Sequence, residues 1–301
     1  MTVPTTFKNL LFYIDRCKIH VIDGNVVFDK TEDSRTYNIP YANISILMTG
    51  PETSITNCAL NKLSEENVTI VSVSNNFNSH TVTLPSQPGQ NTKYFHKLIQ
   101  NLYIDNKRVE IAKNMLIARS THTKELYIEI LVEAFGEEFL DIVEDIVKRL
   151  PEISRERLEE AYTIDTLLGI EGDYMKKIRN VLRESLAFNG DNNEKEEDFQ
   201  KRLKIGNSFT YGMSSTVIHA LGVTSQMNVF HGRTNAGALK YDIADLVKTI
   251  VYITAMFSLS PGMQWTSDTP EEYVKKLGEY CVEKNILKKL FDLAIETLEI
   301  E

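Results

Sequence analysis

The sequence is short of the features that mark several specialised classes of protein. Its three cysteines, Cys17, Cys58 and Cys281, form no CxxC pair and are odd in number, which argues against a structural zinc site and a disulfide scaffold. Only 14 glycines and 8 prolines occur in 301 residues, too few for a collagen-like or disordered chain. We therefore expect reduced thiols in a cytoplasmic protein with an ordinary hydrophobic core.

Long apolar runs and common catalytic motifs are missing as well. No stretch of about 18 apolar residues is present to cross a membrane, and Asp15 and Arg16 interrupt the apolar start of the chain, which makes it a poor signal peptide. Gly-rich phosphate loops and the GxSxG and HExxH motifs are also absent. The sequence predicts neither a membrane protein nor a covalent protein intermediate.

Basic residues are outnumbered by acidic ones. The chain has 33 Lys and Arg against 42 Asp and Glu, a net charge of −9. Because contacts to backbone phosphates need Lys and Arg, this balance is mild evidence against a nucleic-acid-binding protein. It is not decisive, since binding depends on the local field in a cleft. The length predicts about two domains, and 42% hydrophobic residues are enough to bury a core.

The first 90 residues have the pattern of β structure. Short apolar or alternating runs recur between turn residues such as those at 23–24. One helix is expected among them, capped by Thr53 or Ser54. Four residues would share its apolar face: Ile55, Cys58, Ala59 and Leu63. The apolar runs lie at residues 10–14, 19–22, 26–28, 44–47, 68–73 and 81–84.

Beyond residue 90 the apolar period changes from 2 to 3.6, which is typical of helices. Residues 85–91 are rich in Pro, Ser, Gln and Gly and predict a linker. Eight or more helices are expected after it, and the polar stretch 190–198 should be an exposed connection. We predict an α+β fold, with a β-rich, sandwich-like domain that contains one helix at residues 1–88 and an all-α domain at residues 89–301.

Acidic residues and a histidine in the helical part form a candidate metal site. In YDIADLVK, Asp242, Asp245 and Lys248 are each three residues apart, so they would lie along one row of a helix. Glu171, in LLGIEG, is a carboxylate among apolar residues, which is costly unless something compensates it. With His231 of FHGR these acids make a mixed nitrogen and oxygen ligand set suited to Mg²⁺ or Mn²⁺.

Each candidate residue also has an ordinary structural explanation. The acids can be residues at helix N-termini, favoured by the helix dipole. His231 can be a surface or core histidine. Asn207 and Tyr211 of GNSFTYG, four residues apart, can be a buried polar pair on a long helix. Taken singly, none of these residues establishes a catalytic site.

In their order along the chain, these segments resemble the CRISPR-associated integrase family, often called Cas-one, which is the catalytic subunit of spacer acquisition. LLGIEG looks like the segment that carries the family's metal-binding Glu, and GNSFTYG is similar to its Asn-bearing helix. FHGR with YDIADLVK looks like its His and Asp segments. The resemblance covers most of the chain, but it gives no role to Thr234, Asn235 or Lys240 in the segment that follows His231.

The resemblance implies a role for each matched residue. Glu171, His231 and Asp245 would ligate one Mg²⁺ or Mn²⁺, which requires all three to come within about 2.0–2.3 Å of one point. Lys248 would complete the catalytic residues. The choice between Asp242 and Asp245 as primary ligand stays open. The residues that would support the ligands or contact the scissile phosphate are Asp242, Asn207, Tyr211 and Arg233.

The implied reaction is metal-dependent transesterification of DNA. The 3′-hydroxyl of a short DNA fragment, the prespacer, would attack a phosphodiester in the repeat of a CRISPR array. Water in place of that hydroxyl would give endonuclease cleavage. Two alternatives stay open, a structure-selective metal-dependent nuclease without integration and a non-catalytic scaffold that binds DNA ends. The joint presence of Glu171, His231 and Asp245 speaks against the scaffold.

The resemblance also implies partners. The protein would act in a prokaryotic cytoplasm on double-stranded DNA, both prespacer and repeat, as a homodimer formed through its β-rich domain. Two dimers would bind the small second CRISPR adaptation protein. An acidic chain must gather its basic residues to hold DNA, although such residues are also ordinary on solvated helix faces. The candidates that flank the site segments are Lys176, Lys177, Arg179, Lys201, Arg202 and Lys204.

Overall fold

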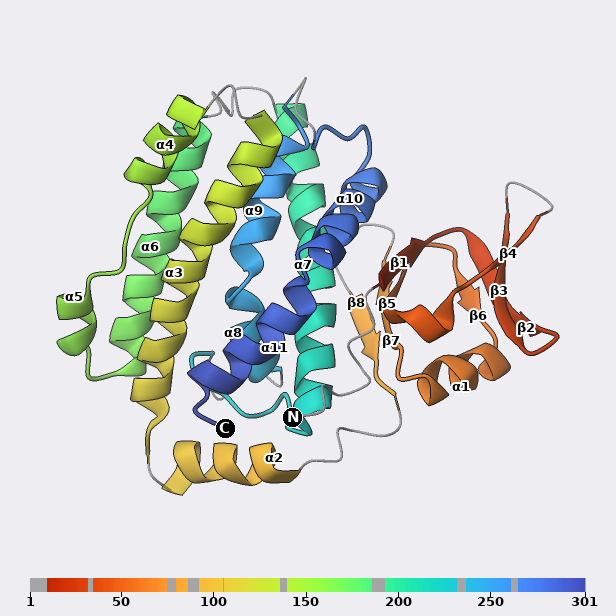
Figure 1. Cartoon of the computed structure of the whole chain (residues 1–301), viewed down its shortest axis with the longest axis horizontal. Coiled ribbons are helices and arrows are strands. Elements are labelled where there is room, and N and C mark those ends of the chain that lie inside the picture. Colours follow the sequence, from red (N-terminus) through yellow and green to blue (C-terminus); the bar gives the residue numbers. More distant parts are fainter. Residues whose placement is uncertain are drawn as a thin grey trace.

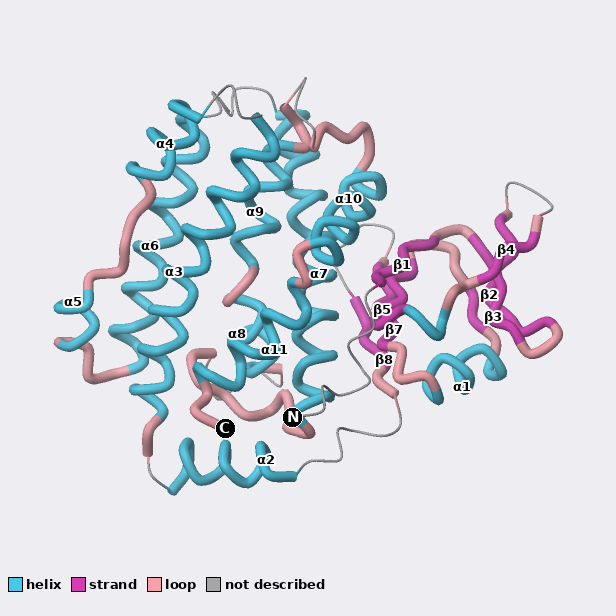
Figure 2. The backbone as a smooth tube through the Cα atoms, viewed as in Figure 1, coloured by secondary structure: helices cyan, strands magenta, loops and turns pink. Residues whose placement is uncertain are grey.

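A computed structural model of the chain describes residues 10–31, 35–74, 80–85, 92–104, 106–135, 140–185, 193–231, 237–260 and 265–300. The predicted α+β fold is confirmed, with strands near the N-terminus and helices through the rest of the chain (Figure 1). Figure 2 shows the strands gathered on one side of the molecule and the long helices on the other. No helix among the described residues is long and apolar enough to span a membrane.

The strands form two four-stranded sheets. The first has the order β1-β5-β7-β8, in which β5 pairs with β1 and β7 in parallel and β8 is antiparallel. The second has the order β4-β3-β2-β6. Their bounds are β1 Leu10–Ile14, β2 Cys17–Ile22, β3 Asn25–Lys30, β4 Thr36–Asn38, β5 Ile44–Thr49, β6 Ser54–Ile55, β7 Thr69–Val73 and β8 His80–Thr83.

The centre of the first sheet is buried on both faces. Every residue of β5 is buried, as expected for a central strand covered on both faces. Ile44 and Leu47 join a core shared with the second sheet, whereas Ile46 and Met48 join the core of the helices. The sheets therefore pack as a sandwich on one side, and the helices cover the other face of the first sheet.

The helix expected within the β region is α1 (Asn57–Glu65), and it begins later than predicted. Thr56, not Thr53 or Ser54, is its N-cap, since the Thr56 side chain accepts a hydrogen bond from the Ala59 amide at 3.4 Å. Ser54 and Ile55 instead form β6 and pair with β2. Cys58 is exposed, so only Ala59 and Leu63 of the predicted face are buried. Strand pairing explains the shift, because Ser54 and Ile55 join β2 instead of starting the helix.

The helical part is built around α7. This helix packs against α8, α9, α10 and α11 and also against β5 and β7 of the first sheet. The bounds are α2 Thr92–Ile99, a π turn at Gln100–Ile104, α3 Arg108–Phe135, α4 Leu140–Arg149, α5 Arg155–Glu159, α6 Ile164–Ser185, α7 Asn193–Leu221, α8 Ala238–Asp245, α9 Lys248–Phe257, α10 Pro270–Glu283 and α11 Ile286–Thr297.

One glycine explains how closely α7 approaches the sheet. A Cβ atom at Gly212 would collide with the Val71 side chain of β7, so only glycine permits this contact. Thr216, one turn further on, donates a hydrogen bond to the Thr69 hydroxyl at 3.0 Å. The helix that carries Tyr211 is therefore fixed against the sheet.

Two predicted connections have different outcomes. Residues 193–198 are not a connection, because they form the first turns of α7, where acidic side chains are favoured by the helix dipole. Residues 186–192 lie outside the described residues. So do residues 86–91 of the predicted linker, and the division into domains at 1–88 and 89–301 therefore stays a prediction.

Candidate active site

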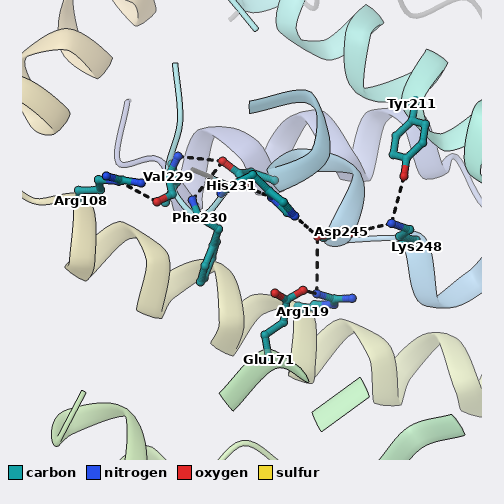
Figure 3. Close-up of polar contacts among 10 residues, drawn as sticks. Arg108, Arg119, Glu171, Tyr211, Val229, Phe230, His231, Asp245 and Lys248 are labelled. Atoms are coloured by element: carbon teal, nitrogen blue, oxygen red, sulfur yellow. Dashed lines mark hydrogen bonds and ion pairs between the residues drawn. The ribbon is translucent and has the colours of Figure 1, made fainter. Parts of the chain in front are cut away.

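The candidate acids and the histidine come from separate elements that meet at one end of the helical core. Glu171 lies within α6, His231 in the loop before α8, and Asp245 at the end of α8 (Figure 3). Lys248 is the first residue of α9, because a turn at residues 246–247 divides the helix on which it was expected to follow Asp242 and Asp245. The Lys248 ammonium still lies 3.4 Å from an Asp245 oxygen.

Asp242 is buried and anchors the loop that carries the histidine. One of its oxygens accepts hydrogen bonds from the amides of Val229 at 2.8 Å and Phe230 at 3.2 Å. The other lies 3.2 Å from the His231 amide and 2.6 Å from the His231 Nδ1. Arg108 of α3 holds the same loop by donating to the Val229 carbonyl at 2.8 Å. Asp242 is thus engaged with protein groups and orients the imidazole.

The contact with Asp242 determines which imidazole nitrogen faces the other acids. Because Nδ1 is bound to Asp242, Nε2 is turned toward Asp245 and lies 3.9 Å from its Oδ2 (Figure 3). The hydrogen bond to Asp242 raises the pKa of His231 above its ordinary value, against the opposing effect of burial. Nε2 is therefore the nitrogen available to a metal ion.

Lys248 links the acidic residues to α7. Its ammonium donates a hydrogen bond to the Tyr211 hydroxyl oxygen at 3.1 Å. Burial works against the charge of Lys248, but Asp245 and Tyr211 together hold its pKa above the ordinary value. Lys248 therefore keeps a positive charge beside Asp245.

Arg119 of α3 is a site residue that the sequence interpretation missed. Its guanidinium forms an ion pair with a Glu171 oxygen and lies 3.9 Å from Asp245 Oδ2. Burial opposes its charge, but Asp245 and Glu171 keep its pKa above the ordinary value. One signal could have identified it: Arg119 follows Ala112, Met115 and Leu116 at helical spacing, so a charge stands on a buried face.

A small cavity separates these charged groups. It has a volume of about 10 Å³, which is about the space that one water-sized sphere occupies. Its polar lining consists of the side chains of Arg119, Glu171, Asp242 and Asp245, and apolar residues close the rest. The Glu171 and Asp245 carboxylates line this cavity, and together with the nearby His231 Nε2 they are donor types that a divalent cation accepts.

The three predicted ligands are not assembled around one point. Among the described residues, no group of three His, Cys, Asp or Glu side chains is arranged to hold a metal ion. His231 Nε2 and Asp245 Oδ2 are close enough to share an ion, since two ligands about 2.2 Å from one cation lie up to about 4.4 Å apart. Glu171 is instead held by Arg119. The donor types fit, but Glu171 is paired with Arg119 and not with the other two residues.

The other predicted residues have mixed outcomes. Asn207 lies one turn before Tyr211 on α7, but none of the hydrogen bonds and ion pairs that join the described site residues involves it. Arg233 lies outside the described residues. Lys176, Lys177 and Arg179 are exposed on α6.

Arg202 corrects the predicted DNA-binding surface. Its side chain is only 1% exposed, and it donates a hydrogen bond to the Ser267 carbonyl at 2.8 Å. It therefore fixes the segment before α10 and is not part of a basic surface. Lys201 lies 3.0 Å from Glu197, and Lys204 is exposed.

A larger cavity adjoins the site on the side of the first sheet. It has a volume of about 640 Å³ and lies between β8, the end of α7 and the start of α8. Its lining includes His80, Lys240 and Tyr241, and none of the described residues that line it is Asp or Glu. The ring of Tyr211 stacks on His80, with centroids 5.2 Å apart, and meets the edge of Tyr241 at 4.9 Å. The Tyr211 ring thus contacts two residues of this cavity, while its hydroxyl contacts Lys248.

Comparison with known proteins gives consistent matches along the chain. The profile of the family described as "CRISPR associated protein Cas1" matches residues 12–294. A curated relative, the CRISPR-associated endonuclease Cas1 of Pseudomonas aeruginosa (strain UCBPP-PA14), is 26% identical over an alignment of 306 positions, which covers 96% of this chain and 91% of the relative.

Several solved structures share the fold. The TtCas1–DNA complex has a TM-score of 0.67 at 17% identity and covers 96% of this chain and 91% of its own. A casposase bound to integration product has a TM-score of 0.70 at 15% identity, with 97% and 91% covered. A Cas6-RT-Cas1–Cas2 complex has a TM-score of 0.65 at 13% identity, with 97% of this chain and 35% of that longer chain covered.

Proposed function

The chain belongs to the family of CRISPR-associated Cas1 proteins, and from this membership we propose that it is a metal-dependent DNA integrase and endonuclease of CRISPR adaptation. It joins the 3′-hydroxyl of a prespacer to the repeat of a CRISPR array by transesterification. The observation that carries the proposal is the proximity of Glu171 from α6, His231 from the loop before α8 and Asp245 from α8: the two acids line one small cavity, and His231 Nε2 lies 3.9 Å from Asp245 Oδ2.

The proposed ligands of Mg²⁺ or Mn²⁺ are Glu171, Asp245 and His231 through Nε2. When bound, the ion polarises the phosphoryl oxygen and offsets the charge that develops there. Asp242 acts through the histidine, because its hydrogen bond to Nδ1 keeps Nε2 directed at Asp245. We therefore choose Asp245 as the ligand and Asp242 as the residue that positions His231.

Lys248 and Tyr211 contribute to the same reaction next to Asp245. The Lys248 ammonium, held between Asp245 and the Tyr211 hydroxyl, supplies positive charge for a phosphate oxygen without giving up a proton, since its pKa is raised. Tyr211 keeps this ammonium in place. Asn207 and Arg233 remain proposed auxiliary residues.

We propose that the DNA strand reaches the site through the larger cavity. The cavity of about 640 Å³ beside Tyr241 has no Asp or Glu among the described residues that line it and gives room for nucleotides next to the acidic residues. Stacking on aromatic rings and contact with Lys240 suit bases and phosphates. Further proposed contacts to the duplex backbone are Lys176, Lys177, Arg179, Lys201 and Lys204.

The proposed assembly is a homodimer through the β-rich domain, with two dimers and the small second adaptation protein in the active complex. The likeness to a chain of the Cas6-RT-Cas1–Cas2 complex supports this partner, and the likeness to the TtCas1–DNA complex supports DNA as the substrate. The likeness to a casposase bound to integration product favours joining over cleavage alone.

A joining assay tests the proposal. The protein is incubated with a supercoiled plasmid that carries a CRISPR repeat, short duplexes with 3′-hydroxyl ends, and Mn²⁺. Joined product that disappears on chelation is the expected result. Cleavage without joining would contradict integration and support a plain nuclease. Activity that survives both chelation and Glu171→Ala would contradict the metal site altogether.

A further inference from the structure

The position between the two proposed ligand carboxylates is taken by a side chain of the protein itself. The Arg119 guanidinium forms an ion pair with Glu171 and lies 3.9 Å from Asp245 Oδ2 (Figure 3). Arg119 comes from α3, 52 residues before Glu171. One cation thus already compensates both acids.

This cation is buried and stays charged. The Arg119 side chain is 5% exposed, and a guanidinium stays protonated in proteins. It also lines the cavity of about 10 Å³ together with Glu171 and Asp245. A divalent ion that used both carboxylates would have to enter the same charged space.

The way in which Arg119 is held makes it replaceable. Its Nε is buried and has no hydrogen-bond partner among the described residues, so the described contacts of its guanidinium are the two acidic side chains. Arg202, a buried arginine of α7, lies 3.8 Å from Asp198 but also donates to the backbone carbonyl of Ser267 at 2.8 Å. A backbone contact can be lost only if the segment moves, whereas a side-chain ion pair can be exchanged for a second cation.

We propose that Arg119 is a stand-in cation for the metal. It keeps Glu171 and Asp245 together before the ion binds, and it is the competitor that the ion must displace from Glu171. Arg119 is therefore a positioning residue that sets the metal affinity of the site. This inference rests on the proposed metal ligands and adds that the protein supplies its own competing charge.

The sign of the effect follows from electrostatics. Removing the guanidinium removes a like charge from the position next to the ion, so the affinity for a divalent cation rises, by about tenfold. The same change leaves two half-buried carboxylates facing each other, so the metal-free protein becomes less stable. A merely structural ion pair would lower stability without raising metal affinity.

The test compares Arg119→Met with Arg157→Met. Arg157 pairs with Asp173 at 2.7 Å on the surface, so its variant is a matched control for loss of an Arg–carboxylate pair. Mn²⁺ binding is measured directly by electron paramagnetic resonance, and the melting temperature is measured with chelator and with Mn²⁺. Arg119→Met should bind Mn²⁺ about tenfold more tightly than the wild type and gain more thermal stability from it, while Arg157→Met should match the wild type.

A second measurement uses the unaltered protein, in case Arg119→Met does not fold. The arginine side chains are labelled with ¹⁵N, the Arg119 signal is assigned with Arg119→Lys, and Mg²⁺ is added. The Arg119 signal should shift in step with ion binding. A signal that stays still while Mg²⁺ binds, or unchanged Mn²⁺ affinity in folded Arg119→Met, overturns the role of Arg119 and leaves the metal site standing. Absence of any ion binding overturns both.

Discussion

The two carboxylates of α8 lie three residues apart in different surroundings. Asp242 belongs to an anchoring region, in which it accepts hydrogen bonds from the backbone amides of residues 229–231 and from His231. Asp245 belongs to an ion-pair region, in which its described partners are the side chains of Arg119, Lys248 and His231. Backbone donors fix a carboxylate, whereas side-chain cations leave it free to exchange partners. The difference separates the framework of the site from its reactive part.

The largest expected effect is on activity in the ion-pair region. Glu171→Gln keeps the size of the side chain but removes the charge that a divalent ion needs, so joining and cleavage rates should fall by about 10²–10³-fold. The measurement is the initial rate at saturating Mn²⁺. Glu184→Gln, on the same helix and in a surface pair with Arg149, is the control and should keep the wild-type rate. A loss of less than about threefold in Glu171→Gln would show that Glu171 is not a ligand.

A substitution in the anchoring region should lower the stability of the protein. Asp242→Asn places an amide against backbone N–H donors, so the free energy of unfolding should drop by about 2–4 kcal/mol. Asp245→Asn should lose much less, because Asp245 contacts no described backbone donor. Urea denaturation of both variants without metal measures the contrast. Equal losses in the two variants would erase the distinction between the regions.

Tyr211→Phe tests how the ion-pair region is held against α7. The change removes the oxygen that accepts from Lys248 and leaves the ammonium with Asp245 and the aromatic ring at position 211, so the joining rate should fall by about three- to tenfold. Tyr162→Phe is a suitable control, since Tyr162 is 81% exposed. A wild-type rate for Tyr211→Phe would mean that Lys248 needs no support from α7.

The smallest expected effect is the pH dependence of stability from His231. Its folded pKa is raised by Asp242, so its contribution to stability is present below the ordinary pKa of 6.5 and is lost as the pH rises through the folded value. Without divalent ions, the melting temperature of the wild type should exceed that of His231→Gln by about 1–2 °C more at about pH 6 than at about pH 8.5.

The control for this pH effect is His122→Gln, in an exposed contact with Glu125 on α3. Subtracting each variant from the wild type removes the titration of other groups. A difference for His231→Gln that grows as the pH rises would contradict the pairing of His231 with Asp242.

Local patterns predicted the classes of structure and the order of the motifs but not every boundary. The strand-to-helix change after residue 90 is visible because the apolar period changes. The start of α1 was wrong because Ile55 pairs with Ile19 of β2, a contact between distant residues. The break between α8 and α9 was also missed, since residues 241–257 continue the helical pattern across it.

The site shows the same limit. Glu171, His231, Asp245 and Lys248 were identified through their resemblance to a family. Arg119 was missed because that resemblance supplied no matching motif around it. Arg202 was assigned to a DNA-binding surface because the charge of a residue does not show whether its side chain is buried. In the structure it is buried and donates to the Ser267 carbonyl.

By itself, the sequence determined where strands and helices occur and which residue types could bind a cation, because periodicity and side-chain chemistry are local properties. Only the tertiary structure decided that Asp242 serves the loop while Asp245 faces the cavity. It also decided that a guanidinium from α3 lies between the acids of α6 and α8. These arrangements depend on the packing of helices that are far apart in the sequence, and the spacing of residues along the chain does not specify the distances between packed helices.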